Sequence, residues 1–339
     1  MDIAGKAGPL VTTPNHLAIT PGVNVHGAWA EPVPELITGE LATWMSATSV
    51  TPARVPGYWT YKKGFNPDIG APPTPGEKVV YLMHGGAYIR LSAHPTDPTA
   101  AIARGLVQHI GSVHRAFSIE YRLASHKPYP VANPFPAALL DALAGYNYLV
   151  DVVGFTPSNI IIAGDSAGGN LAHALTRYLI EYKDTPGVNL PAPAGALILL
   201  SPWMDLSTSH EVPGSSAETC APSDYIRPIE KGIHYAKDAF LGPLGIGAAS
   251  HNKYISPASL HPSMTVDFKG FPRTFIVAGG AEVLLDQIRT FRERMAKDLD
   301  DKHLKYVEAE DGIHDYLVFE WHEPERTDTL KQIGKWVDN

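Results

Sequence analysis

From residue 78 onward, continuous apolar runs alternate with segments of helical periodicity. The run from Val79 to Met83 is typical of a strand that is buried on both faces of a sheet. Strands alternating with helices predict an α/β fold with a mostly parallel sheet and helices on both faces. Strands are predicted at 79–83, 116–121, 159–163, 196–200, 274–278 and 304–308, and helices at 98–110, 136–150, 169–182, 286–299 and 327–337.

Two regions break this alternation. Residues 1–75 are rich in Pro, Gly and Thr and contain one helical pattern, at 33–45. Residues 207–263 begin without periodicity and then show helical signals at 225–240. We expect both regions to form a cap over the carboxyl ends of the strands, where active sites lie in such sheets. The predicted division is an N-terminal cap segment at 1–60, a core segment at 61–206, a cap insertion at 207–263 and a second core segment at 264–339.

The segment from Gly164 to Gly169 places Ser166 among small residues, between a predicted strand and a predicted helix. A tight strand-to-helix turn lifts a serine hydroxyl clear of the sheet, and glycines remove the side chains that would collide there. The first amide of the new helix, that of Ala167, points to the place where an oxyanion would form. This pattern predicts a nucleophilic serine.

A nucleophilic serine needs a base and an acid, and both are expected at strand ends. His314 follows the last predicted strand, whereas His303 precedes that strand and His322 lies near a polar helix start. We therefore predict His314 as the base. After the preceding strand, Glu282 lies closer to the strand end than Asp286, which begins a helix and suits an ordinary structural role there. Glu282 is the predicted acid.

Residues 84–88 follow the strand at 79–83 and lack bulky side chains at three positions, so their backbone amides can approach a substrate closely. The predicted oxyanion donors are the amides of Gly86, Ala87 and Ala167. Supporting roles are predicted for His84, Gly85 and Asp165, and a substrate contact for Tyr88.

Together these motifs resemble the hormone-sensitive-lipase-like branch of the α/β-hydrolase fold, the His-Gly-Gly-Gly esterases. The resemblance covers roughly residues 78–337. The oxyanion motif departs from the family pattern by ending in Ala87, and Glu282 stands where most relatives have Asp. The variant motifs look most like those of fungal members. Further matching motifs lie at 121–124, 135–138, 201–206 and 254–257.

The resemblance implies an α/β-hydrolase fold with a cap, and hydrolysis of short-acyl or modest carboxylic esters without metal or cofactor. It also implies a triad of Ser166, Glu282 and His314. Two alternatives remain open from the sequence. The same machinery could serve an amidase or lactonase, or the scaffold could bind a small ligand without turnover.

Composition and charge limit the classes of partner that the chain is expected to bind. The formal net charge is −8, and no dense block of Lys and Arg is present, so we expect no nucleic-acid partner. The lone Cys220 cannot form an intramolecular disulfide and is expected to be inert. No signal peptide or membrane span is apparent, so we expect a cytoplasmic protein with a small-molecule ester substrate. A homo-oligomer is compatible with the sequence but is not readable from it.

Overall fold

The computed structural model describes residues 14–226 and 231–339. Residues 1–13 of the predicted N-terminal cap segment, and residues 227–230 of the predicted cap insertion, lie outside the described residues.

An eight-stranded sheet has the order β1-β2-β4-β3-β5-β6-β7-β8. Strand β2 runs antiparallel to β1 and β4, and the other neighbouring strands are parallel, which confirms the predicted mostly parallel sheet. The strands are β1 (His26–Ala30), β2 (Val55–Tyr61), β3 (Lys78–Met83), β4 (Val113–Ile119), β5 (Ile160–Asp165), β6 (Ala196–Leu200), β7 (Arg273–Gly279) and β8 (Leu304–Ala309).

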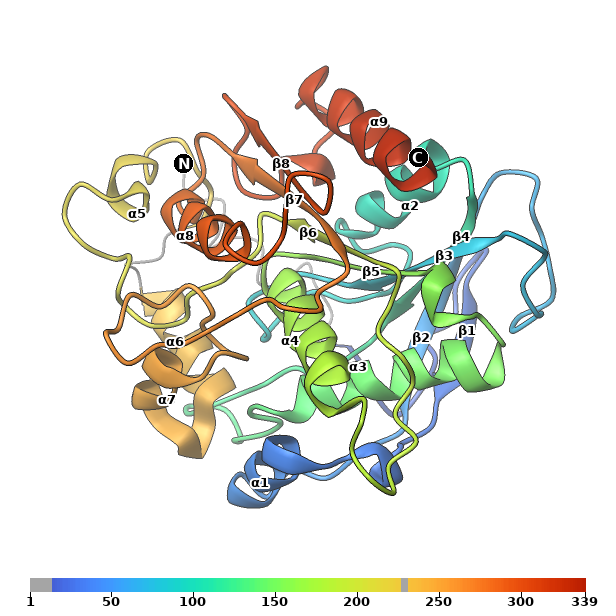
Figure 1. Cartoon of the computed structure of the whole chain (residues 1–339), viewed down its shortest axis with the longest axis horizontal. Coiled ribbons are helices and arrows are strands. Elements are labelled where there is room, and N and C mark those ends of the chain that lie inside the picture. Colours follow the sequence, from blue (N-terminus) through green and yellow to red (C-terminus); the bar gives the residue numbers. More distant parts are fainter. Residues whose placement is uncertain (1–13, 227–230) are drawn as a thin grey trace.

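Helices cover both faces of this sheet (Figure 1). The helices are α1 (Gly39–Ala47), α2 (Ala100–His109), α3 (Ala137–Asn147), α4 (Ala167–Tyr182), α5 (Ser216–Thr219), α6 (Lys231–Leu241), α7 (Gly245–His251), α8 (Leu285–Met295) and α9 (Glu325–Asp338). Helices α2 and α9 pack together on one face, and α3 and α4 pack together on the other.

Strand residues divide between two cores because successive side chains point to opposite faces. In β3, Val79, Tyr81 and Met83 belong to the core under α3 and α4, while Val80 and Leu82 belong to the core under α2 and α9. All five are buried, as expected for a strand covered on both faces.

The N-terminal region departs most from the expected elements. The helical pattern at 33–45 forms a short 3-10 turn at Pro34–Leu36 followed by α1. Strands β1 and β2 were not predicted, although both fall largely within residues 1–60, which were assigned to the cap, and both belong to the central sheet. Strand β2 was not recognised in the sequence because it contains Pro56 and Gly57, two residue types that are uncommon inside strands. A Cβ at Gly57 would lie 2.2 Å from the Phe117 ring, so this strand requires its glycine.

Within residues 14–226 and 231–339, no helix combines the length and apolar character that crossing a bilayer requires.

Candidate active site

Ser166 lies on the turn between β5 and α4, as the sequence predicts. Its backbone has φ 50° and ψ −118°, in a region that residues other than glycine rarely occupy. The turn is tight because the flanking glycines touch backbone directly. A Cβ at Gly164 would lie 2.2 Å from the Gly168 carbonyl oxygen, and one at Gly168 would lie 2.1 Å from the Met83 carbonyl oxygen. The chain thus holds Ser166 in a strained conformation that is typical of a nucleophile.

The loop after β3 lies directly beside this turn. The Gly85 N–H donates to Asp165 Oδ2 at 2.9 Å, so the residue before the serine fixes the loop. Gly86 and Ala87 follow with φ of 105° and 54°. No described residue accepts a hydrogen bond from the N–H of either. The N–H of Ala167, the first residue of α4, also has no intrahelical partner. Three donors are therefore available beside Ser166.

His84 lies behind this loop. Its ring stacks on Tyr121 at 4.3 Å, and its Nδ1 lies 2.7 Å from the Gly85 carbonyl oxygen. The Tyr121 hydroxyl donates to the His84 carbonyl oxygen at 2.7 Å. The His84 Nε2 lies 3.7 Å from Glu120 Oε1. These contacts place His84 directly beside the loop, and its supporting role stays a prediction.

Tyr88 is almost fully buried. Its hydroxyl donates to Asn170 Oδ1 at 2.8 Å, and its ring stacks on Phe240 of α6 at 3.9 Å. Asn170 in turn donates to the carbonyl oxygens of Trp203 and Ile255. The tyrosine thus anchors the loop to α4, and its contact with substrate stays a prediction. Asn170 was not predicted from the sequence, because its three partners come from distant segments.

Glu282 and His314 occupy the loops after β7 and β8. The His314 Nδ1 lies 4.0 Å from Glu282 Oε1. The other carboxylate oxygen, Oε2, accepts from Ser201 Oγ at 2.5 Å and from the Gly279 N–H at 3.0 Å. The structure therefore brings the predicted acid and base together, with Ser201 fixing the carboxylate. Ser201 belongs to a matching motif, but no local pattern identified its contact with Glu282.

The base does not contact Ser166 in this conformation. Within the described residues of the chain, no hydrogen bond joins the Ser166 hydroxyl to His314. The His314 Nε2 instead lies 3.1 Å from Asp315 Oδ2. The turn between β5 and α4 that carries Ser166 (the elbow) and the loop that carries His314 are nevertheless neighbours. The Ser166 N–H donates to the Leu200 carbonyl oxygen, and the adjacent Ser201 Oγ accepts from the Asp315 N–H.

Burial and carboxylates together set the charge of the site. Burial alone would lower the pKa of His314, but Asp315 and Glu282 outweigh that effect and hold this pKa well above its ordinary value. Burial raises the pKa of Glu282, against opposing contributions from His314 and Ser201. Burial, followed by repulsion from Asp315, holds the pKa of Asp165 well above its usual range.

The rival residues lie elsewhere. Asp286 accepts a hydrogen bond from the Ser216 N–H, and His303 is exposed and paired with Asp300. His322 follows the His314 loop and has no polar partner for its buried Nε2 among the described residues. Among the same residues, no cluster of His, Cys, Asp and Glu side chains is arranged to hold a metal ion.

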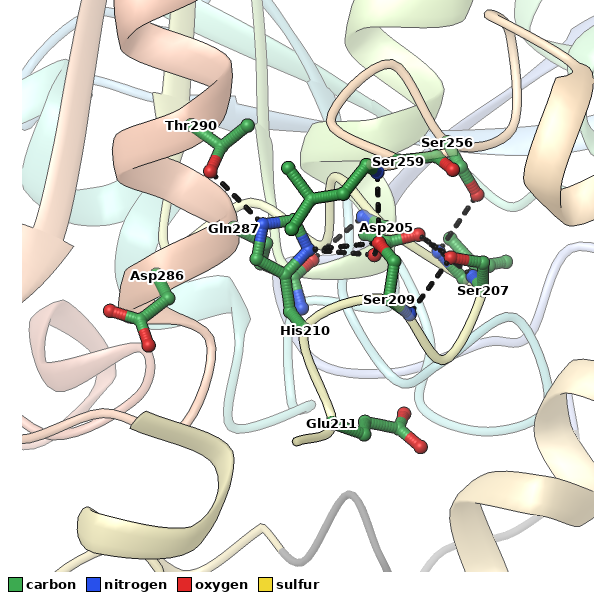
Figure 2. Close-up of polar contacts among 12 residues, drawn as sticks. Asp205, Ser207, Ser209, His210, Glu211, Ser256, Ser259, Asp286, Gln287 and Thr290 are labelled. Atoms are coloured by element: carbon green, nitrogen blue, oxygen red, sulfur yellow. Dashed lines mark hydrogen bonds and ion pairs between the residues drawn. The ribbon is translucent and has the colours of Figure 1, made fainter. Parts of the chain in front are cut away.

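A second hydroxyl–histidine–carboxylate array, which the sequence did not predict, joins Thr290, His210 and Asp205 (Figure 2). Of these three residues, His210 and Thr290 line a cavity of about 480 Å³. His210 Nδ1 lies 2.7 Å from Asp205 Oδ2, and its Nε2 lies 3.0 Å from Thr290 Oγ1. Thr290 lies in the middle of α8, far from any strand-to-helix turn. Asp205 also accepts from the hydroxyls of Ser207 and Ser209. Both ring nitrogens of His210 are thus paired, and the array joins the loop after β6 to α8. We therefore assign the array a structural role.

A family model described as alpha/beta hydrolase fold matches residues 79–318. An esterase of Acinetobacter venetianus is 31% identical over 265 residues, covering 77% of this chain and 74% of the relative. Esterase LipU of Mycobacterium tuberculosis is 27% identical over 260 residues, covering 77% of each. The crystal structure of a hormone-sensitive lipase from a metagenome library aligns with a TM-score of 0.62 and 26% identity, covering 83% of this chain and 80% of that one.

Proposed function

The chain belongs to the hormone-sensitive-lipase-like branch of the α/β-hydrolase family, and we propose that it hydrolyses carboxylic esters through an acyl-enzyme on Ser166. One observation carries this proposal: a serine with strained backbone faces unused amide donors, and a histidine–carboxylate pair lies at the neighbouring strand ends. This combination is what nucleophilic acyl transfer requires.

In the proposed reaction, His314 Nε2 takes the proton of Ser166 as Oγ attacks the ester carbonyl carbon. The oxyanion accepts hydrogen bonds from the amides of Gly86, Ala87 and Ala167, each worth about a hundredfold to a thousandfold in rate. His314 then gives the proton to the leaving alcohol. Water attacks the acyl-enzyme in the same way and releases the acid. Glu282 orients the imidazole and stabilises its cation.

We also propose that residues 207–226 and 231–263, together with α1, cover this site. Phe240 stacks on Tyr88 of the oxyanion loop, and the Tyr225 ring lies 5.9 Å from the His314 ring. Trp44 of α1 packs against Tyr254 at 5.0 Å, which joins the two segments. We propose that these aromatic side chains restrict the site to short-acyl or otherwise modest esters.

The test compares Ser166→Ala with Ser263→Ala. Ser263 is a matched control because its hydroxyl also pairs with histidines, His251 at 2.7 Å and His261 at 2.8 Å, but lies on the surface. With p-nitrophenyl butyrate, S166A should lose about a millionfold in kcat, reaching background, while S263A keeps full activity. A fluorophosphonate should label the parent chain and S263A but not S166A.

Retained turnover or labelling in S166A would refute the nucleophile assignment. Rates on a matched butyryl ester, lactone and anilide test the bond that is cleaved. Faster turnover of the lactone or anilide would overturn the ester assignment while leaving the machinery in place.

A further inference from the structure

The imidazole of His314 has a carboxylate near each of its two ring nitrogens. Its Nδ1 is 4.0 Å from Glu282 Oε1, too far for a good hydrogen bond, whereas its Nε2 is 3.1 Å from Asp315 Oδ2. Both side chains of the His314–Asp315 pair are at least nine-tenths buried. The shorter contact therefore belongs to the carboxylate that the proposed triad does not use.

This arrangement leaves polar atoms without partners. His314 Nδ1, Glu282 Oε1 and Asp315 Oδ1 are all buried and accept or donate no hydrogen bond among the described residues. A movement of the imidazole by about 1 Å toward Glu282 would pair the first two of these atoms. Buried polar atoms are costly to leave unpaired, so pairing Nδ1 with Glu282 would offset part of the cost of giving up the Asp315 contact.

The Asp315 backbone is fixed while its carboxylate is aimed at the base. Asp315 has φ 51° and ψ 36°, a left-handed conformation that Asp and Asn tolerate better than most residues. Its N–H donates to Ser201 Oγ at 3.1 Å, and the same hydroxyl donates to Glu282 Oε2. Ser201 therefore fixes the backbone of Asp315 and the side chain of Glu282 on either side of His314.

The contact between Nε2 and Asp315 favours a protonated Nε2. An ionised carboxylate has no proton to donate, so Asp315 at 3.1 Å stabilises the form of the imidazole that carries a proton on Nε2. A general base must instead present an unprotonated Nε2 to the Ser166 hydroxyl. The form that Asp315 stabilises therefore cannot act as the base.

We propose that Asp315 is a positioning residue whose carboxylate competes with Ser166 for Nε2 of His314, holding the protonated ring away from the nucleophile until that proton is lost. This inference rests on the proposed function. It predicts that, as the pH is lowered, activity begins to fall at a higher pH than it would if Glu282 were the only carboxylate beside His314.

The sign follows from the charges that face the ring. The negative charge of Asp315 favours the imidazolium, so the pKa of His314 is raised and activity is lost as pH falls through that raised value. Removing the charge should move the loss to lower pH. The other titratable groups facing His314 are Glu282 from the loop after β7, Asp165 from the elbow, and Asp224 and Tyr225 from the 207–263 segment.

The experiment measures kcat/KM against pH for the parent chain, Asp315→Asn and Asp315→Gly. Asn keeps the shape without the charge, and both Asn and Gly suit the left-handed backbone, so at least one variant should fold. In both variants the acid limb of the kcat/KM profile should move to lower pH by about one unit or more. At a given pH on that limb, kcat/KM relative to its plateau value should then be roughly tenfold higher than in the parent chain. Asp286→Asn, which removes a carboxylate that does not face His314, should leave the limb unchanged.

A second readout is independent of turnover. In the Ser166→Ala chain labelled with ¹⁵N-histidine, NMR titration of His314 should show a lower pKa when Asp315 is replaced by Asn. An unchanged acid limb together with an unchanged His314 titration would overturn the role of Asp315. If the parent chain hydrolyses no ester, lactone or anilide, the proposed function fails, and the titration alone still decides whether Asp315 holds the proton on Nε2.

Discussion

Ser201→Ala removes a hydroxyl that serves two elements of the proposed machinery at once. The side chain is buried, its Oγ donates to Glu282 Oε2 at 2.5 Å, and it accepts from the Asp315 N–H at 3.1 Å. Alanine fits the same space and removes both hydrogen bonds. Glu282 Oε2 keeps only the Gly279 N–H, and the buried Asp315 N–H keeps no partner among the described residues.

The magnitude follows from these two losses. A hydrogen bond to a charged group is worth about 1.5–3 kcal/mol, and an unpaired buried N–H costs about 1–3 kcal/mol. We therefore expect Ser201→Ala to lower the free energy of unfolding by roughly 3–5 kcal/mol. The carboxylate also loses the contact that fixes its position. Because misplacement of a catalytic group by about 1 Å can cost a hundredfold, kcat should fall by about tenfold to a hundredfold.

Urea unfolding and ester kinetics, measured side by side, check both numbers. Ser216→Ala is the matched control, because Ser216 is also buried, and its Oγ donates to the Val283 carbonyl oxygen at 3.1 Å and accepts from the Asp286 N–H at 3.0 Å. It should lose stability without a change in kcat. If both variants lower kcat equally, or if Ser201→Ala loses less than about 1 kcal/mol, the reasoning about Glu282 is wrong.

Two further substitutions test the elbow and the core. Gly168→Ala places a Cβ 2.1 Å from the Met83 carbonyl oxygen, so we expect kcat to fall more than about a hundredfold. The control is Gly247→Ala, which has open space around it. It should leave kcat unchanged and alter the melting temperature only through the higher helix propensity of alanine. Full activity in G168A would contradict the close approach. Glu77→Ala leaves the fully buried Arg115 guanidinium without its 2.8 Å partner and should cost about 3–5 kcal/mol in urea unfolding. A loss below about 1 kcal/mol would show that the ion pair contributes little.

The turn that carries Ser166 and the loops that carry Glu282 and His314 could be placed from the sequence because their signals are local. Small residues around Ser166, between an apolar run and a helical pattern, require a tight turn wherever they occur. The position of His314 after the last strand, and of Glu282 after the one before, follows from parallel topology, since carboxyl ends meet at one edge. These features needed no tertiary information.

The remaining features depend on contacts that no window of sequence contains. The contacts of Ser201 with Glu282 and Asp315 arise because the loops after β6, β7 and β8 converge. The motif at 201–206 gave no sign of the Glu282 contact. Strand β2 was missed because its glycine is explained only by Phe117 of a partner strand. Whether Asp315 faces solvent or the base is likewise decided by a single left-handed backbone angle.

Helix α4 carries a consequence for how this protein can diversify. Every residue from Ala167 to Leu179 is buried, and its first turn holds Ser166 and Asn170 against three separate segments. Side chains on such a helix have little freedom to vary without disturbing Ser166, the proposed nucleophile. We therefore expect substrate preference to change through the aromatic side chains of the proposed cap, such as Tyr225 and Phe240, rather than through α4.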